Sequence, residues 1–126
     1  MQNNNAKLKT DLKTRAYWHA LDVMRFIDTL DKKDFSVQII SKQLLRSITS
    51  IGANIIEAQA GSTKKDFTNF FSYALKSANE SKFWIGLLRD SEKGDKDKLA
   101  KLLQETNELS NMLGSSILTL RGKKKY

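Results

Sequence analysis

The stretch RSITSIGANIIEAQAGSTKKDF, residues 46–67, decides the fold because it combines a helix pattern with residues that oppose one. Its isoleucines recur three and four positions apart, which is the spacing of a buried helix face. Gly52, however, costs a helix interior about 1 kcal/mol relative to alanine, and Glu57 needs water or a partner beside an apolar face. We interpret Gly52 as a point where the helix bends or where another helix approaches closely.

The apolar stripe continues before this stretch and predicts a helix over about 36–59, with Ser36 as its N-cap. Its members are Val37, Ile40, Leu44, Ile48, Ile51, Ile55 and Ala58. Gly61 ends the pattern, and Ser62 or Thr63 can cap a third helix over about 63–91. The third helix has one apolar face that comprises Phe67, Phe70, Phe71, Ala74, Ala78, Ile85 and Leu88.

Two further stripes predict the first and last helices. The first begins at Tyr17, ends near the turn at 31–34, and consists of Tyr17, Ala20, Leu21, Met24 and Ile27, with Val23 and Leu30 beside it. The last follows the charged turn at 92–98 and consists of Leu99, Leu102, Leu103, Thr106, Leu109, Leu113, Ile117 and Leu120. Because short connections make sequential helices antiparallel, we expect an all-α, up-down-up-down antiparallel four-helix bundle, with residues 1–126 as a single domain.

The composition agrees with long helices and excludes several chemistries. The 126 residues include no proline and no cysteine, so no disulfide or thiolate metal site can form. The lone histidine, His19, has Ala16 three positions before it, whereas a di-iron bundle requires Glu-x-x-His pairs. We therefore expect no metal and no cofactor, with His19 on a helix surface.

The net charge of +8 lies mainly in residues 1–15 and 121–126, which leaves the body nearly neutral. Basic ends of this kind either keep a protein soluble or contact a polyanion. The sequence shows no apolar signal segment and no apolar run that is long enough to cross a membrane. We expect a soluble, cytoplasmic protein.

The third helix carries apolar side chains outside its main face. A single face is enough for a bundle core, so a second apolar face implies a further partner, most simply another copy of the chain. The side chains that we expect at such a subunit interface are Tyr73, Phe83, Trp84 and Leu87.

A motif on the second and third helices resembles the four-helix-bundle family first noticed as proteins encoded in intervening sequences of 23S ribosomal RNA genes. The matching residues are Arg46, Ser50, Ile51, Ala53, Asn54, Ile55, Glu57, Lys65, Phe67, Ala74, Ser77 and Glu80. Gly52 stands where the family usually has proline, and Ile56 and Ala58 replace the usual alanine and glycine around Glu57. The resemblance extends over nearly the whole chain, from about Tyr17 to Leu120.

This resemblance implies a bundle that assembles into homopentamers, with no established enzymatic activity. A related branch, the accessory variability determinant of diversity-generating retroelements, is a basic pentamer that associates with reverse transcriptase and nucleic acid. For this chain we expect a homopentamer, with RNA, DNA or another protein as further partners.

Polar residues lie beside the predicted core and form a strip. We expect them to make a structural network that sets how the helices meet, and they are Arg46, Ser50, Asn54, Glu57, Ser77 and Glu80. Glu57 and Glu80 could instead be an acid–base pair. The sequence supplies no nucleophile, metal ligands or phosphate-binding glycine loop near them, so we favour the structural interpretation.

The function that the sequence favours is a non-enzymatic, homo-oligomeric scaffold with weak, sequence-independent nucleic-acid binding through basic termini. The residues expected to contact nucleic acid are Lys7, Lys9, Lys13, Arg15, Lys64, Lys65, Arg121, Lys123, Lys124 and Lys125. Lys64 and Lys65 could instead be a solvated helix start, which is the interpretation that we favour for these two residues. The alternative function is a protein-binding adaptor in which the basic ends only aid solubility.

Overall fold

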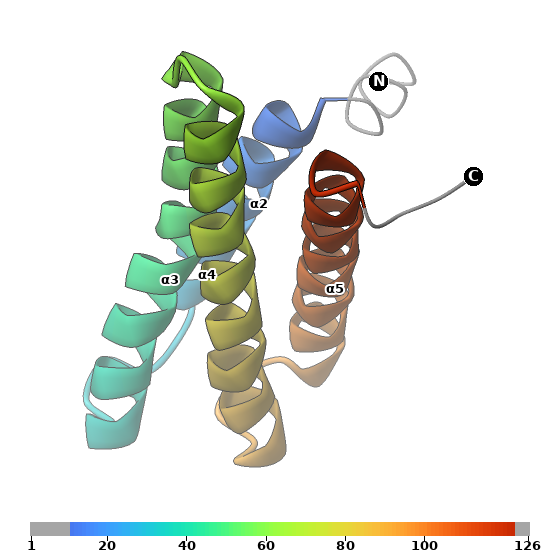
Figure 1. Ribbon diagram of the computed structural model, residues 1–126. Coiled ribbons are helices and arrows are strands. Elements are labelled where there is room, and N and C mark those ends of the chain that lie inside the picture. Colours follow the sequence, from blue (N-terminus) through green and yellow to red (C-terminus); the bar gives the residue numbers. More distant parts are fainter. Residues whose placement is uncertain (1–10, 123–126) are drawn as a thin grey trace.

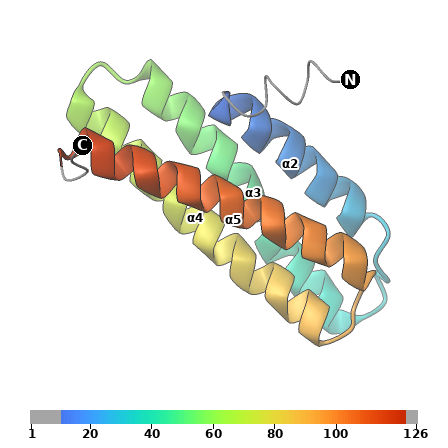
Figure 2. The same cartoon turned by 90° about the vertical axis from the view of Figure 1, so that its right-hand side faces the viewer.

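Four helices in one antiparallel bundle make up the part of the chain that the structure, a computed structural model, describes, which is residues 11–122 (Figure 1). They are α2 (Leu12–Ile27), α3 (Phe35–Ala60), α4 (Lys64–Asp90) and α5 (Lys96–Leu120). Each helix packs against the next in the chain, and α2 also packs against α5, so the four surround a common core (Figure 2). The predicted fold class is confirmed.

The helices begin at side-chain caps that the sequence analysis placed only in part. Thr63 caps α4, as predicted, and accepts a hydrogen bond from the Asp66 backbone N–H. Asp34, rather than Ser36, caps α3 and accepts from the N–H of Val37. Asp11 and Asp95 likewise cap α2 and α5, which therefore start earlier than the apolar stripes do. An N-cap aspartate accepts a hydrogen bond from a backbone N–H that has no partner within the helix. Its negative charge also interacts favourably with the positive end of the helix dipole.

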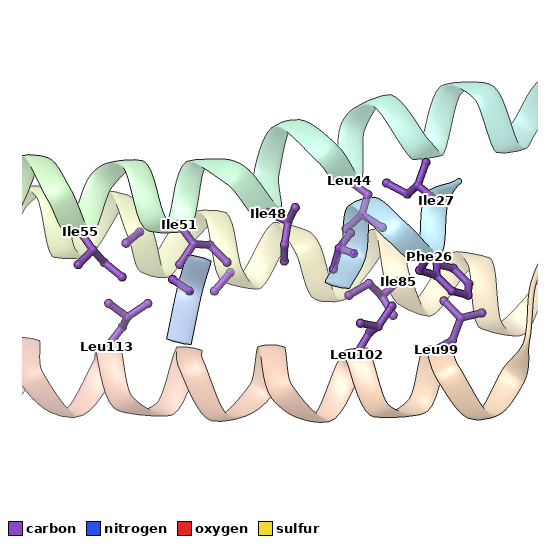
Figure 3. Close-up of a cluster of buried hydrophobic side chains, with 14 of the residues drawn as sticks. Phe26, Ile27, Leu44, Ile48, Ile51, Ile55, Ile85, Leu99, Leu102 and Leu113 are labelled. Atoms are coloured by element: carbon purple, nitrogen blue, oxygen red, sulfur yellow. The ribbon is translucent and has the colours of Figure 1, made fainter. Parts of the chain in front are cut away.

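The core lies where the isoleucine stripe of α3 meets the other three helices. Leu44, Ile48, Ile51 and Ile55 are fully buried, and Figure 3 shows them pointing toward Leu113 of α5 and the rest of the cluster. The buried faces of α4 and α5 also follow the predicted stripes, with Phe67, Phe70 and Leu103 only partly covered. The periodicity therefore located three of the four core faces.

The predicted core face of α2 is wrong in part, since Ile27 is buried as expected but the rest of the stripe is not. Tyr17 is 65% exposed and Met24 is 45% exposed, although both were expected in the core. The buried face is instead formed by Ala16, His19, Val23, Phe26 and Ile27. Helix α2 has apolar side chains on two faces. The buried face includes the polar His19, so the apolar pattern alone did not identify it.

Candidate interaction surfaces

The predicted polar strip forms between α3 and α4, without Glu57. Ser77 Oγ donates to Ser50 Oγ at 2.9 Å, and Asn54 Nδ2 donates to the Ser50 hydroxyl and carbonyl oxygens, each at 2.9 Å. Each of these residues is next in sequence to a residue of the core stripe. Because one residue corresponds to a rotation of about 100° around the helix, their side chains point to the flank that α3 and α4 share. The hydrogen bonds fix the register of α3 against α4.

A second part of the strip lies closer to solvent. Arg46 is 3.5 Å from Glu80, whose carboxylate also accepts a 3.0 Å hydrogen bond from the Trp84 indole nitrogen. The Arg46 side chain is 71% exposed, so water screens this ion pair and its contribution to stability is small. Glu80 therefore orients Trp84 more than it stabilises the bundle.

Glu57 stands apart from the strip. Its side chain is exposed and makes no hydrogen bond or ion pair within residues 11–122. On α3 it projects outward, one position before the buried Ala58. The contacts of Ser47 with Ser81 and of Ser50 with Ser77 place Glu80 beside Ser47, about 15 Å along α3 from Glu57. Glu57 and Glu80 therefore do not form the carboxylate pair that acid–base chemistry would require.

The sequence analysis missed a buried serine pair that lies beneath the polar strip. Ser47 and Ser81 hydroxyl oxygens are 2.7 Å apart, and both side chains are buried. Ser81 donates its proton to the Ser77 carbonyl at 2.9 Å, so Ser47 is the donor between the two hydroxyls, and the Leu44 carbonyl oxygen lies farther from Ser47 Oγ, at 3.2 Å. Both serines fall within otherwise apolar helix faces, which was the signal that could have identified them.

The outer side of α4 exposes three of the four predicted interface residues. Phe83 is 59% exposed, and Tyr73 and Leu87 are also exposed. Trp84 is only partly exposed because its ring packs against the core cluster while its nitrogen bonds Glu80. Exposed aromatic side chains cost solubility unless they are covered by a partner, so this α4 surface, defined by Tyr73, Phe83 and Leu87, is a candidate contact site.

A second apolar surface is the groove between α2 and α3, with a volume of about 790 Å³. Tyr17, Leu21, Met24 and Ile56 form its walls, and small residues keep its floor low because they leave the helix backbones uncovered. The floor residues are Ala16, Ala20, Gly52 and Ala53. Of the residues expected in the α2 core, Tyr17, Ala20, Leu21 and Met24 therefore line a solvent-accessible groove, whereas Ile27 is buried.

The basic residues predicted to contact nucleic acid have different surroundings. Lys13, Lys64, Lys65 and Arg121 are exposed. Arg15 instead places its guanidinium between Glu105, at 2.8 Å, and Glu108 of α5. The hydrogen bonds that Arg15 donates to the Glu105 carboxylate raise the pKa of Arg15 above its usual value. This arginine ties α2 to α5, and its charge is already compensated.

The remaining predicted basic contacts lie outside the described residues. They are Lys7, Lys9, Lys123, Lys124 and Lys125.

His19 is buried, which corrects the expectation that it lies on a helix surface. Its Nε2 is 2.7 Å from the Thr106 hydroxyl oxygen, and that hydroxyl donates its own proton to the Leu102 carbonyl. Nε2 must therefore carry the proton that it shares with Thr106. Burial lowers the pKa of His19 to about 4, so the ring is neutral at pH 7.

The described residues offer neither a metal site nor a membrane span. Across residues 11–122, no group of three histidine, cysteine, aspartate or glutamate side chains is arranged to hold a metal ion. None of the described helices has the length and hydropathy needed to cross a membrane.

The bundle and its polar strip define the class as a short-loop antiparallel four-helix protein. Comparison with known families identifies it further, since the model of the 23S rRNA-intervening sequence protein family matches residues 9–115. The chain belongs to this family, as its motif on α3 and α4 predicted.

A solved structure supports the same assignment. The crystal structure of a protein of unknown function in the S23 ribosomal protein family, from Bacteroides thetaiotaomicron, is similar with a TM-score of 0.78 and 34% identity. The similarity covers 85% of this chain and 98% of that one. No curated protein matches the chain.

Proposed function

We propose that the chain is a non-enzymatic, self-assembling helical scaffold whose basic ends bind nucleic acid weakly and without sequence preference. The observation that carries the proposal is the apolar outer side of α4, where Tyr73, Phe83 and Leu87 stay exposed although the opposite face of the helix already fills the core. A second copy of the chain would cover these side chains. The family resemblance makes a pentamer the expected assembly.

Sedimentation of the full chain tests self-assembly. We expect a species several times the 14.4 kDa of one chain, and Phe83→Glu should lower its mass because a carboxylate cannot be buried unpaired in an apolar contact. Asn111→Glu places the same new charge on an exposed position of α5 and should leave the mass unchanged. A wild-type protein that sediments as one chain at micromolar concentration would contradict the proposal.

The nucleic-acid part rests on the net charge of +8 and on the exposure of Lys13, Lys64, Lys65 and Arg121. Binding through exposed cations weakens as salt rises, because each neutralised phosphate releases condensed counterions. Assembly raises the effective concentration of these cations. Glutamine substitutions at the terminal lysines should weaken binding at low salt, and unchanged affinity would remove the terminal mechanism.

The protein-adaptor function is a second candidate, favoured by the apolar groove between α2 and α3. It predicts a protein that co-purifies from the native cell while no RNA or DNA is enriched. Recovery of nucleic acid after nuclease-free purification would favour the scaffold proposal instead.

A further inference from the structure

A small cleft between the last turn of α2 and the first turns of α5 is lined mainly by cations. Its volume is about 370 Å³, and Arg25, Lys98 and Lys101 surround it. Asp22 is the single carboxylate among its lining residues, so the charge around the cleft is clearly positive. The sequence analysis did not single out this cluster because its members are far apart in the chain.

The three cations are not used by the fold. Within the described part of the chain, the side chains of Arg25, Lys98 and Lys101 form no hydrogen bond or ion pair. Four other cations of the bundle form ion pairs within the described residues, namely Arg15, Arg46, Arg89 and Lys93. Lys98 also lies in the first turn of α5, where a positive charge opposes the helix dipole. Helix stability therefore does not explain its position.

The floor of the cleft strengthens the positive potential. Phe26 and Leu102 line it and are buried side chains of the core. An apolar wall has a low dielectric constant, so field lines from the surrounding cations are focused into the cleft rather than screened by water. The Thr29 hydroxyl already donates to the Phe26 carbonyl, at 2.6 Å. The Thr29 hydroxyl proton is therefore not available to a ligand, and the cleft offers the positive charge of its cations.

We propose that this cleft binds backbone phosphates of a nucleic acid. Charged donors without a base-reading group select phosphate and not sequence. The cations are exposed and come from two helices, so the cleft does not enclose a free ion, whereas a polyanion engages several of them at once and releases counterions. The inference rests on the nucleic-acid part of the proposed function and assigns it a site on the body of the bundle.

The test measures the anisotropy of a labelled single-stranded oligonucleotide with full-length variants. The cleft variant is Lys98→Gln with Lys101→Gln, and the control is Lys33→Gln with Lys42→Gln, which removes the same charge from exposed lysines of the α2–α3 turn and α3. If each cleft lysine neutralises one phosphate, the loss of affinity between about 50 and 200 mM salt should be about sevenfold smaller in the cleft variant than in wild type. Circular dichroism checks that the helices are intact.

A further variant, Lys123→Gln with Lys125→Gln, separates the cleft from the terminal mechanism. If it binds like wild type while the cleft variant is weakened, the cleft inference holds and the terminal mechanism fails. A cleft variant that matches the Lys33 and Lys42 control overturns the inference, as does a wild-type chain that binds no oligonucleotide. Displacement of the oligonucleotide by inorganic phosphate at equal concentration would also overturn it, since the cleft would then select the free ion.

Discussion

At the scale of single residues, two glycines in similar apolar surroundings differ in the space around them. A Cβ at Gly52 would lie 3.6 Å from the Ala16 Cβ, an ordinary contact, whereas one at Gly94 would lie 2.8 Å from the Phe26 ring. Gly52→Ala should therefore raise the free energy of unfolding by about 1 kcal/mol, since alanine is the better helix former. Gly94→Ala should lower it by about 1–3 kcal/mol through overpacking.

Thermal or urea unfolding of the two glycine variants checks this contrast. A destabilising Gly52→Ala would show that α2 and α3 cannot tolerate a methyl group where they cross. Ala16 of α2 lies opposite Gly52, but at a distance that leaves room for a Cβ, so the approach of α2 does not by itself require glycine there. Gly52 lies within α3, which runs without interruption from Phe35 to Ala60.

His19 makes stability depend on pH. Its pKa falls from 6.5 in the unfolded chain to about 4 in the bundle because burial disfavours the charged ring. The unfolded chain therefore binds the proton more readily, so this contribution to stability is complete above pH 6.5 and is lost as pH falls toward 4. The total loss is about 3 kcal/mol.

Urea unfolding between pH 7 and 4 measures the effect of His19. His19→Gln keeps an N–H donor for Thr106 but cannot titrate, and it should flatten that part of the stability profile. Carboxylates that titrate near pH 4 contribute to both proteins, so the difference between the profiles isolates the histidine. Parallel profiles would show that His19 is not the group responsible.

At the scale of helices, the sequence predicted α3 most accurately because its core stripe is aliphatic and uninterrupted. The face of α2 was not predictable in the same way, since Tyr17, Leu21 and Met24 form a stripe as regular as the buried one. The choice depends on His19 meeting Thr106 of α5, a contact across 87 positions of sequence. Hydrophobic period alone contains no information on such a pair.

The candidate site was predictable to a similar extent. Ser50, Asn54 and Ser77 meet as expected because their spacing on two antiparallel helices brings them to one flank. Glu57 shares that spacing but projects beyond the flank, and the cations of the α2–α5 cleft belong to no local motif. Features that form where helices distant in the sequence pack together could therefore be identified only from the structure.

The α3–α4 pair provides a prediction at this scale. Ser47→Ala removes the buried bond to Ser81, which keeps its hydrogen bond to the Ser77 carbonyl. Because no buried group loses every partner, the free energy of unfolding should fall by only about 1 kcal/mol. Glu57→Ala, an exposed residue on the same helix, should change it by less than about 0.5 kcal/mol. A reversed order, measured by urea unfolding, would contradict this account of the strip.

At the scale of the whole molecule, two separate apolar surfaces determine how copies could meet. The α4 surface and the α2–α3 groove lie on different sides of the bundle and contain different residues. If the α4 surface of one copy entered the groove of the next, an open row of copies would keep a free α4 surface at one end and a free groove at the other. Both would be covered only when a ring closed. If each surface instead paired with itself, the two contacts would be independent.

Substitutions in the two surfaces distinguish these arrangements. Met24→Glu charges a wall of the groove without touching α4, and Phe83→Glu charges α4 without touching the groove. In a head-to-tail ring both variants lack the same contact, so each should sediment as a single chain, and a mixture of the two should form a dimer because one intact α4 surface meets one intact groove. Self-paired surfaces would leave an oligomer in each variant alone, and the mixture would then show no new species.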